Sequence, residues 1–372
     1  MRSNWKKTLL FSTAALTFGT MASAQETQQS INLVQTSVPF LTISPDARSG
    51  AMGNAGIATT PDAFSTFWNS AKLPFSSSNG QIGFTYTPWL SDITNDVYLL
   101  SLGTYYKPDD NSALSLGFRY FNLGNIPLTL DGGVPNGTAN PKELAFQVGY
   151  SRKLSEKFGI GITGKYIYSN LGNGVADDGS NYKSGNAFAA DISGYYNGLD
   201  ETGAGFTGGL TLSNLGTKIS YSTSGDKLFL PANLGLGGAY HSVIDEDNKL
   251  TFALDVNHLL VPKYPITSTD SADYFSTSVV GGWGKSFSNS AWGGSLGVEY
   301  GYDNMFFLRA GYHAETTNQG DMKYFTAGVG VKYNVLDFNF AYLAPSGSGY
   351  NRNPLSNTMR FSLVFDLGSQ NN

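Results

Sequence analysis

From Gln81 onwards the chain alternates between apolar and small or polar residues in runs of the length of a β-strand. One such run places apolar side chains at every second position: Phe158, Ile160, Ile162, Tyr166 and Tyr168. The alternate positions hold small or polar side chains: Gly159, Gly161, Thr163, Lys165 and Ser169. Similar runs cover residues 114–120, 144–150, 250–257 and 359–367. A two-residue period with one apolar face predicts β-strands.

The polar faces of these runs indicate a confined interior. A solvated sheet face would be rich in Lys and Glu, whereas these positions hold mostly Gly, Ser, Thr and Ala. We therefore predict that the apolar faces meet lipid and that the other faces line the lumen of a barrel. The charged residues expected in this lumen are Arg119, Lys165, Asp191, Asp255, Glu299, Arg309, Lys332, Asp337 and Arg360. If the intervening turn does not shift the alternation of the two faces, Glu299 and Arg309 both point into the lumen from neighbouring strands and form an ion pair there.

The connections between the runs set the number of strands. Fifteen candidate strands can be counted, but bacterial single-chain barrels use even numbers. The short connections, expected to be periplasmic turns, are residues 107–112, 155–156, 200–203, 245–248, 303–304 and 334–335. The long ones, expected to be extracellular loops, are residues 125–141, 172–185, 216–228 and 260–290. One of the fifteen candidates is the run at residues 274–287. Short and long connections alternate to the end of the chain only if this run is part of the last loop and not a strand. We predict an all-β fold, a transmembrane antiparallel β-barrel of about 14 strands, with both termini in the periplasm.

A segment rich in Gly and Ala precedes the strands and is predicted to plug the barrel. In residues 45–73, glycines recur every three residues, and small side chains let a backbone lie close against another surface. The residues that define this plug are Pro45, Asp46, Arg48, Gly50, Gly53, Gly56, Trp68 and Asn69. An amphipathic helical hairpin on a soluble domain is the alternative.

The N-terminus and the composition agree with an exported membrane barrel. Residues 1–24 combine a basic start, a short apolar run and Ala22-Ser23-Ala24, which predicts a signal peptide cleaved after Ala24. We expect a lead-in and plug over residues 25–80 and the barrel over residues 81–372. Only 14% of residues are charged, against the usual quarter, while 45 are Gly and 14% are aromatic. Without the three basic residues of the signal peptide the net charge is 20 − 28 = −8, which argues against nucleic acid as a partner.

Candidate chemistry is sparse. There is no Cys, so thiolate metal sites, disulfides and thiol nucleophiles are excluded. The three His residues share no strand face or helical turn, and we expect no metal and no cofactor. The best enzymatic alternative is a lipid hydrolase that uses His313 with Ser276 or Ser278 and Glu315. The sequence GAMGNAG lacks the Lys-Ser/Thr of a nucleotide-binding loop.

The plug sequence PDARSGAMGNAGIATTPDAFSTFWNSAKL resembles the N-terminal signature of FadL-type outer-membrane barrels. Within that superfamily the chain resembles the PorV family of type IX protein secretion. The supporting stretches are GVEY at 297–300, LRAGY at 308–312, YFTAGVG at 324–330 and FNFAYL at 338–343. The chain departs from the family pattern at two places. Ser70 stands where many relatives have Pro, and the loop around residues 281–294 looks short and lacks the acidic helix that the resemblance implies there.

The resemblance implies a non-enzymatic carrier in the outer membrane. PorV-like proteins receive cargo that bears a C-terminal β-sandwich signal domain after it leaves the SprA-type translocon, and pass it to the attachment complex of the PorU-type sortase. The candidate contact residues in the extracellular loops are Asn125, Leu130, Pro135, Asn173, Tyr182, Tyr221, Phe229, Tyr264, Tyr274 and Trp283. The alternative is a FadL-like transporter of long-chain fatty acids or other hydrophobic small molecules, which would need an apolar pocket in the lumen.

Overall fold

The structure is a computed structural model. It describes residues 34–90, 94–129, 132–172, 174–175, 181–222, 225–265, 268–345 and 357–368. The expected signal peptide and its cleavage site lie outside the described residues.

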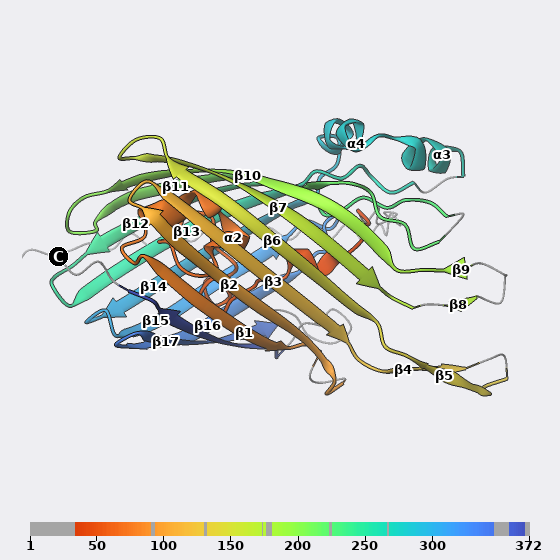
Figure 1. Ribbon diagram of the computed structural model, residues 1–372, viewed down its shortest axis with the longest axis horizontal. Coiled ribbons are helices and arrows are strands. Elements are labelled where there is room, and N and C mark those ends of the chain that lie inside the picture. Colours follow the sequence, from red (N-terminus) through yellow and green to blue (C-terminus); the bar gives the residue numbers. More distant parts are fainter. Residues whose placement is uncertain are drawn as a thin grey trace, which may run out of the picture. The chain divides into compact units, whose positions relative to one another are not determined.

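Fourteen antiparallel strands form a closed barrel, as the sequence predicted. Strand β1 pairs with β18 and closes the ring, and each other barrel strand pairs with the barrel strands that precede and follow it along the chain (Figure 1). The barrel strands are β1 (Gly80–Pro88), β2 (Val97–Asp109), β3 (Ser112–Leu123), β6 (Lys142–Lys153), β7 (Phe158–Asn170), β10 (Gly185–Leu199), β11 (Gly205–Gly216), β12 (Asn233–Val243), β13 (Asn248–Leu259), β14 (Trp292–Tyr302), β15 (Phe306–Glu315), β16 (Lys323–Tyr333), β17 (Leu336–Pro345) and β18 (Met359–Asp366).

The two faces of the strands differ as the alternation predicted. In β7, Ile162 is 56% exposed on the outer wall, whereas its neighbour Thr163 is 1% exposed on the lumen side. The same alternation of exposed apolar and buried small or polar residues continues through β3, β6 and β13. An outer wall of exposed Leu, Ile, Val, Phe and Tyr suits contact with lipid.

Short turns lie at one end of the barrel and long loops at the other, which we call the turn end and the loop end. At the turn end, Asp303 and Asn304 both have positive φ, which is the geometry of a tight type I′ hairpin turn. At the loop end stand two short hairpins, β4 (Ile126–Thr129) with β5 (Pro135–Ala139) and β8 (Gly174–Val175) with β9 (Asn181–Tyr182).

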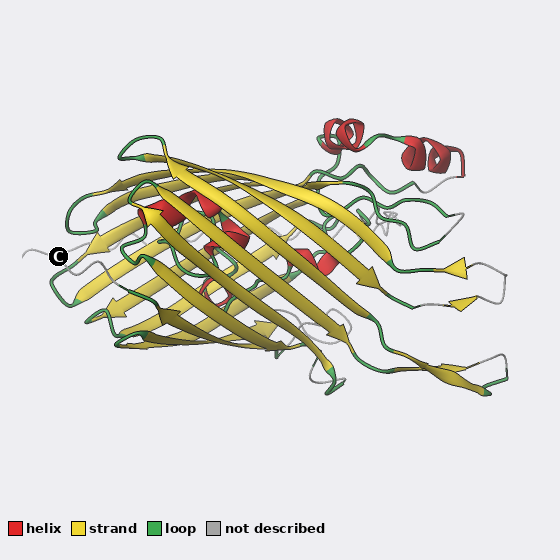
Figure 2. Cartoon of the chain, in the orientation of Figure 1, coloured by secondary structure: helices red, strands yellow, loops and turns green. Residues whose placement is uncertain are grey.

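The long loop over residues 260–290 is helical. As predicted, it adds no strand to the barrel, but it folds into α3 (Ser268–Ser276) and α4 (Val279–Ser286), which stand beside the loop end (Figure 2). Helix α4 begins where the Ser278 side chain accepts a hydrogen bond from the Gly281 N–H. Among the described residues, no helix has the length and apolarity needed to cross a membrane.

Residues 34–79, which we call the N-terminal segment, lie inside the barrel (Figure 1). The segment contains η1 (Pro39–Thr42), α1 (Ala47–Ala51), α2 (Ser65–Trp68) and η2 (Ser70–Phe75). A Cβ added at Gly53, where φ is +67°, would lie 2.6 Å from the backbone oxygen of Tyr312. The backbone of the segment therefore lies directly against the barrel wall, which only Gly permits. That the segment closes the lumen as a plug stays a prediction.

The prediction that both termini lie at the turn end is wrong for the start of the described chain. The Val34 N–H donates to the Asn318 oxygen in a loop at the loop end, and Val34 packs in a cluster with Phe229 and Tyr274. At the other terminus, Gly368 accepts a hydrogen bond from the Asn79 N–H at the turn end. The described chain enters at the loop end because Val38 and Phe40 are fully buried in the apolar cluster with Leu99 and Phe121.

Candidate functional site

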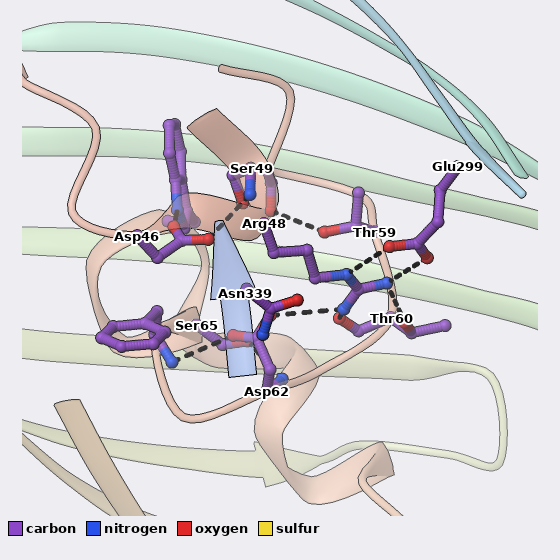
Figure 3. A network of polar contacts seen from close by, with 12 residues as sticks. Asp46, Arg48, Ser49, Thr59, Thr60, Asp62, Ser65, Glu299 and Asn339 are labelled. Atoms are coloured by element: carbon purple, nitrogen blue, oxygen red, sulfur yellow. Dashed lines mark hydrogen bonds and ion pairs between the residues drawn. The ribbon is translucent and has the colours of Figure 1, made fainter. Parts of the chain in front are cut away.

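An ion network fixes the N-terminal segment to the barrel wall (Figure 3). Arg48, on α1, donates from Nε and Nη2 to the two carboxylate oxygens of Glu299 on β14, at 2.9 and 2.8 Å. Arg309 on β15 donates from Nε to the same carboxylate at 2.6 Å. Glu299 and Arg309 are register partners, so the predicted cross-strand ion pair is confirmed. A carboxylate between two arginines is a strong, directional link.

The same network ties the turns of the segment to each other. The Arg48 guanidinium also donates to Thr60 Oγ1 at 2.8 Å and lies 3.3 Å from Asp62 Oδ2. Asp46, which caps α1, accepts from the Ser49 N–H at 2.7 Å and from Trp68 Nε1 at 2.8 Å. Burial raises the pKa of Asp46. These contacts hold residues 46 to 68 together as one unit.

A second link joins Asp255 to the backbone of the segment. Asp255 Oδ2, on β13, accepts the N–H groups of Gly56 and Ile57 at 2.7 and 2.9 Å. Lys72 donates to the oxygens of Gly56 and Thr59 at 2.7 and 3.2 Å, and its burial lowers its pKa to about 8. The sequence analysis did not identify Lys72, because a single lysine carries no signal that it is buried.

The remaining plug residues also lie in the lumen. Asn69 Nδ2 donates to the backbone oxygens of Ile57 and Gly194, at 3.1 and 3.0 Å. Pro45 is buried immediately before the capping residue Asp46. Ser70, where relatives have Pro, lies 3.2 Å from Ser193 on the wall, between the hydroxyl oxygens.

The other predicted lumen charges are spread over the wall. Lys165 Nζ lies 2.7 Å from Asp191 Oδ2, next to an irregularity in the pairing of β10 with β11. Arg119 and Arg360 are buried beside the N-terminal segment. Lys332 is half-buried on β16.

A cavity of about 690 Å³ opens at the turn end, below the ion network. Its lining mixes apolar residues such as Phe64, Phe75 and Phe307 with charged ones: Arg48, Asp62, Glu299, Lys332 and Asp337. The loop half of the lumen is different, because an apolar cluster fills it. Its members are Val38, Phe40, Val97, Leu99, Phe121, Ala145, Ile167, Ala187, Ala189, Ile219 and Leu230.

The loop end presents exposed apolar side chains on structured elements, which we call the outer loop surface. On the β4–β5 hairpin and its tip, the exposed fractions are 47% for Ile126, 42% for Leu128 and 56% for Val134. Beside α4, Val280 and Phe287 are 69% and 65% exposed. None of these five residues was singled out from the sequence.

The predicted contact residues are distributed over the surface and interior of these loops. Asn125, Pro135 and Tyr182 are exposed. The half-buried ones are Tyr221, Tyr264 and Trp283, and the buried ones are Phe229 and Tyr274. Leu130 and Asn173 lie outside the described residues.

The buried aromatic residues hold the helical loop in place. Phe229 and Tyr274 stack edge to face, with ring centroids 5.4 Å apart. Lys218 Nζ lies 4.0 Å from the centre of the Phe229 ring and donates to the Phe275 oxygen, near the end of α3, at 3.1 Å. Phe229 and Tyr274 therefore support the outer loop surface from beneath.

The predicted hydrolase constellation does not form. His313 Nδ1 lies 2.9 Å from Ser295 Oγ, and Nε2 lies 3.3 Å from Glu315 Oε1, so neither Ser276 nor Ser278 is its partner. Ser295 is 1% exposed, which leaves no room for a substrate at its hydroxyl. In the part of the chain that the structure describes, no cluster of three His, Asp or Glu residues could hold a metal.

Comparison with solved structures shows the class of fold, a FadL-like outer-membrane barrel. The chain is similar to CymD, a monoaromatic hydrocarbon channel, with a TM-score of 0.57 and 12% identity over 88% of this chain and 99% of that one. It is also similar to the toluene transporter TbuX of Ralstonia pickettii, with a TM-score of 0.51 and 10% identity over 86% and 97%. The toluene transporter TodX of Pseudomonas putida is similar with a TM-score of 0.52 and 13% identity, over 85% of this chain and 95% of that one.

The family follows from the sequence itself. Residues 24–266 match the family model described as type IX secretion system protein PorV. The chain belongs to the PorV family. No curated protein matches it.

Proposed function

We propose that this protein is a non-enzymatic carrier of type IX secretion. In this proposal it binds the C-terminal signal domain of secreted cargo as the cargo leaves a SprA-type translocon. It then delivers the cargo to a PorU-type sortase complex at the cell surface. Membership of the PorV family supports the secretion system, and the outer loop surface is the observation that carries the binding step.

The outer loop surface has the features of a recognition site for a folded protein domain. Its apolar side chains stand on a hairpin and on α4, whose Gly282 lies against the Phe229 ring, so little conformational entropy is lost when a partner binds. Apolar side chains exposed on structured elements are typical of protein interfaces. Phe229 and Tyr274 pack beneath the helical loop and support it.

Transport of hydrophobic small molecules, the alternative from the sequence, has less support. The similar structures named as hydrocarbon channels share only 10–13% identity, so the likeness concerns the fold. A hydrocarbon passage needs a continuous apolar route, whereas the lining of the cavity at the turn end is interrupted by charged residues such as Arg48, Glu299 and Lys332. In the loop half, side chains of the chain itself occupy the apolar space.

The decisive experiment changes the hairpin part of the outer loop surface. A triple variant replaces its exposed apolar residues: Ile126→Ser, Leu128→Ser and Val134→Ser. If a partner buries these three side chains, their replacement removes apolar burial worth on the order of 1 kcal/mol each, so co-purification of cargo from solubilised outer membranes should fall at least about tenfold. The amount of folded barrel should not change, because none of the three side chains is buried.

A matched control makes the same change at the opposite end. Leu154, Ile244 and Val335 lie in turns at the turn end and are 63%, 61% and 55% exposed. Their triple replacement by Ser should leave the recovery of cargo unchanged. Equal recovery with both triple variants would contradict the proposed binding surface, and loss of fatty-acid uptake alone would favour the transporter.

A further inference from the structure

The N-terminal segment occupies only one side of the lumen at the turn end. Its element η2 packs against β3, β6, β7 and β10. The cavity of about 690 Å³ lies on the other side, where its barrel lining comes from β10, β12 to β18, β1 and the turn that joins β10 to β11. The turns that join β2 to β3 and β6 to β7 contribute no residue to it. A cavity of this size is typical of a ligand-binding site.

The lining of this cavity carries more acidic than basic side chains. Seven carboxylates and four Lys or Arg side chains line it, so the net charge of the lining is 4 − 7 = −3. Two of the four basic groups are already neutralised, because Arg48 and Arg309 both bind Glu299. Lys249 donates to the side chain of Asn304 at 2.8 Å. The cavity therefore keeps an excess of negative charge.

Two of the carboxylates are free to meet a ligand. Asp337 on β17 is half-buried and accepts a hydrogen bond from Asn339 at 3.0 Å. It forms no ion pair with a basic residue of the described chain, although Lys332 is its register partner. Glu201, in the turn after β10, is exposed, and its side chain has no partner among the described residues.

Exposed carboxylates continue this charge around the mouth of the cavity. Three successive turns, which join β10 to β11, β12 to β13 and β14 to β15, form an acidic arc without Lys or Arg: Asp200, Glu201, Asp245, Glu246, Asp247 and Asp303. The opposite side of the turn end mixes both signs of charge: Lys107, Asp109, Asp110, Arg152, Lys153, Glu156 and Lys157. A cleft lined mainly by one sign of charge attracts ligands of the other sign.

Apolar surface lies between the carboxylates of the cavity. Phe64, Phe75 and Phe307 are part of its lining. A Lys or Arg side chain packs its methylene groups on apolar surface while its charged end reaches a carboxylate. The lining thus offers complementary contacts to both parts of a basic side chain.

We infer that the cavity binds an extended, Lys- or Arg-rich segment of a periplasmic protein. The turn end faces the periplasm, as the short turns of outer-membrane barrels do. Glu201 belongs both to the lining and to the acidic arc, so the acidic surface continues from the lumen onto the rim, further than a small cation reaches. The site lies at the end opposite the outer loop surface, and its test does not depend on cargo binding.

Binding of a labelled peptide to the detergent-solubilised barrel tests the inference. A fluorescent peptide of alternating Lys and Ala should bind saturably, and more tightly than spermine of the same charge. Its affinity should fall as salt is raised, because salt screens contacts between partly exposed charges. A peptide with Glu in place of Lys should not bind. Equal affinity for the two peptides, or for the Lys peptide and spermine, would overturn the inference.

Paired variants locate the site. Glu201→Gln combined with Asp337→Asn removes both free carboxylates and should weaken binding of the Lys peptide about tenfold. The matched control, Asp109→Asn combined with Glu156→Gln, changes exposed carboxylates at the same end but outside the cavity, and should leave the affinity unchanged. Equal affinities of the two double variants would contradict the site.

Carbodiimide cross-linking locates the peptide in the unmodified protein, where no variant has to fold. Amide bonds should form between the Lys side chains of the bound peptide and the carboxylates of Glu201 and Asp337, and mass spectrometry identifies them. Cross-links mainly to Asp109 or Glu156 would overturn the inference.

Discussion

At the scale of single residues, the interior of this barrel depends on a few buried charges. Glu299 neutralises two arginines at once, one from the N-terminal segment and one from the neighbouring strand. Removal of one member of a buried ion pair leaves an uncompensated charge, which costs far more than the pair contributes as a whole. The buried charges therefore make the position of the N-terminal segment specific.

Glu299→Gln tests this link. The variant removes the carboxylate partner of Arg309 and leaves Arg48 with Asp62 alone, so we expect a loss of about 3–5 kcal/mol in the free energy of opening the segment. Hydrogen exchange of residues 46–62 measures it. The matched control is Asp273→Asn, which breaks an exposed pair with Lys285 and should cost under about 1 kcal/mol. Similar losses in the two variants would contradict the role of Glu299.

Gly53→Ala tests the close approach of the segment to the wall. At this position φ is positive, and a Cβ would lie 2.6–2.7 Å from backbone oxygens of Tyr312 and Leu296. Gly203 has a similar φ of +86° with open space around it, so Gly203→Ala carries only the conformational cost, about 1–2 kcal/mol. We expect Gly53→Ala to lower the free energy of unfolding in denaturant by clearly more than Gly203→Ala. Equal effects would mean that the segment is not pressed against the wall.

Lys72 gives the segment a pH dependence. Its folded pKa of about 8 is below its ordinary value of 10.5, so between pH 8 and 10 the unfolded state binds more protons than the folded state. Stability of the segment should therefore rise with pH in this window, by about 3 kcal/mol at most. Exchange of residues 56–72 should slow from pH 8 to 10, after correction for the intrinsic rate. Lys72→Met should remove this trend, and a trend that survives in the variant would contradict the assignment.

At the scale of elements, the loop end owes its shape to contacts from other parts of the chain. Lys218 donates a hydrogen bond to the Phe275 oxygen near the end of α3, and its Nζ lies over the ring of Phe229. Lys218→Met should leave the barrel intact but free the helical loop. We expect limited proteolysis within residues 268–290 to accelerate several-fold, while Lys323→Met, an exposed lysine at the same end, should have no effect. An unchanged cleavage rate in Lys218→Met would show that other contacts hold the loop.

The sequence predicted the elements whose signal is periodic and local. Alternation located the strands and even the pairing of Glu299 with Arg309, because parity across a two-residue turn is fixed. It did not predict α4, whose Val and Gly residues are poor helix formers and whose helix depends on the Ser278 cap and on packing. It also missed the burial of Phe40, since the apolar residues at 38–43 form a run too short to show a period.

For the candidate site, too, local patterns could be predicted from the sequence and tertiary contacts could not. The Gly-rich pattern indicated close packing of residues 45–73, and the structure places that stretch against the wall. The loops were located from their length, but the exposed residues on them were not. Which of the side chains is exposed depends on the hairpin and helices that the loops form, and those are set by tertiary contacts.

At the scale of the whole molecule, the structure combines a lipid-facing wall, an interior filled by its own N-terminal segment and a structured surface at the loop end. Inside the barrel, a cavity with charged residues in its lining lies at the turn end, and an apolar cluster fills the loop half. Such a molecule is suited to present a rigid surface at the membrane. The protein belongs to the PorV family of type IX secretion, and we propose that cargo binds at the outer loop surface.

Photo-crosslinking in living cells tests this proposal most directly. A photoreactive amino acid at Leu128 or Val280, both on the outer loop surface, should form adducts with the C-terminal signal domains of secreted proteins. The same amino acid at Ile244, equally exposed at the turn end, should form none with these domains. Adducts with cargo only from Ile244, or from none of the three positions during active secretion, would contradict the account.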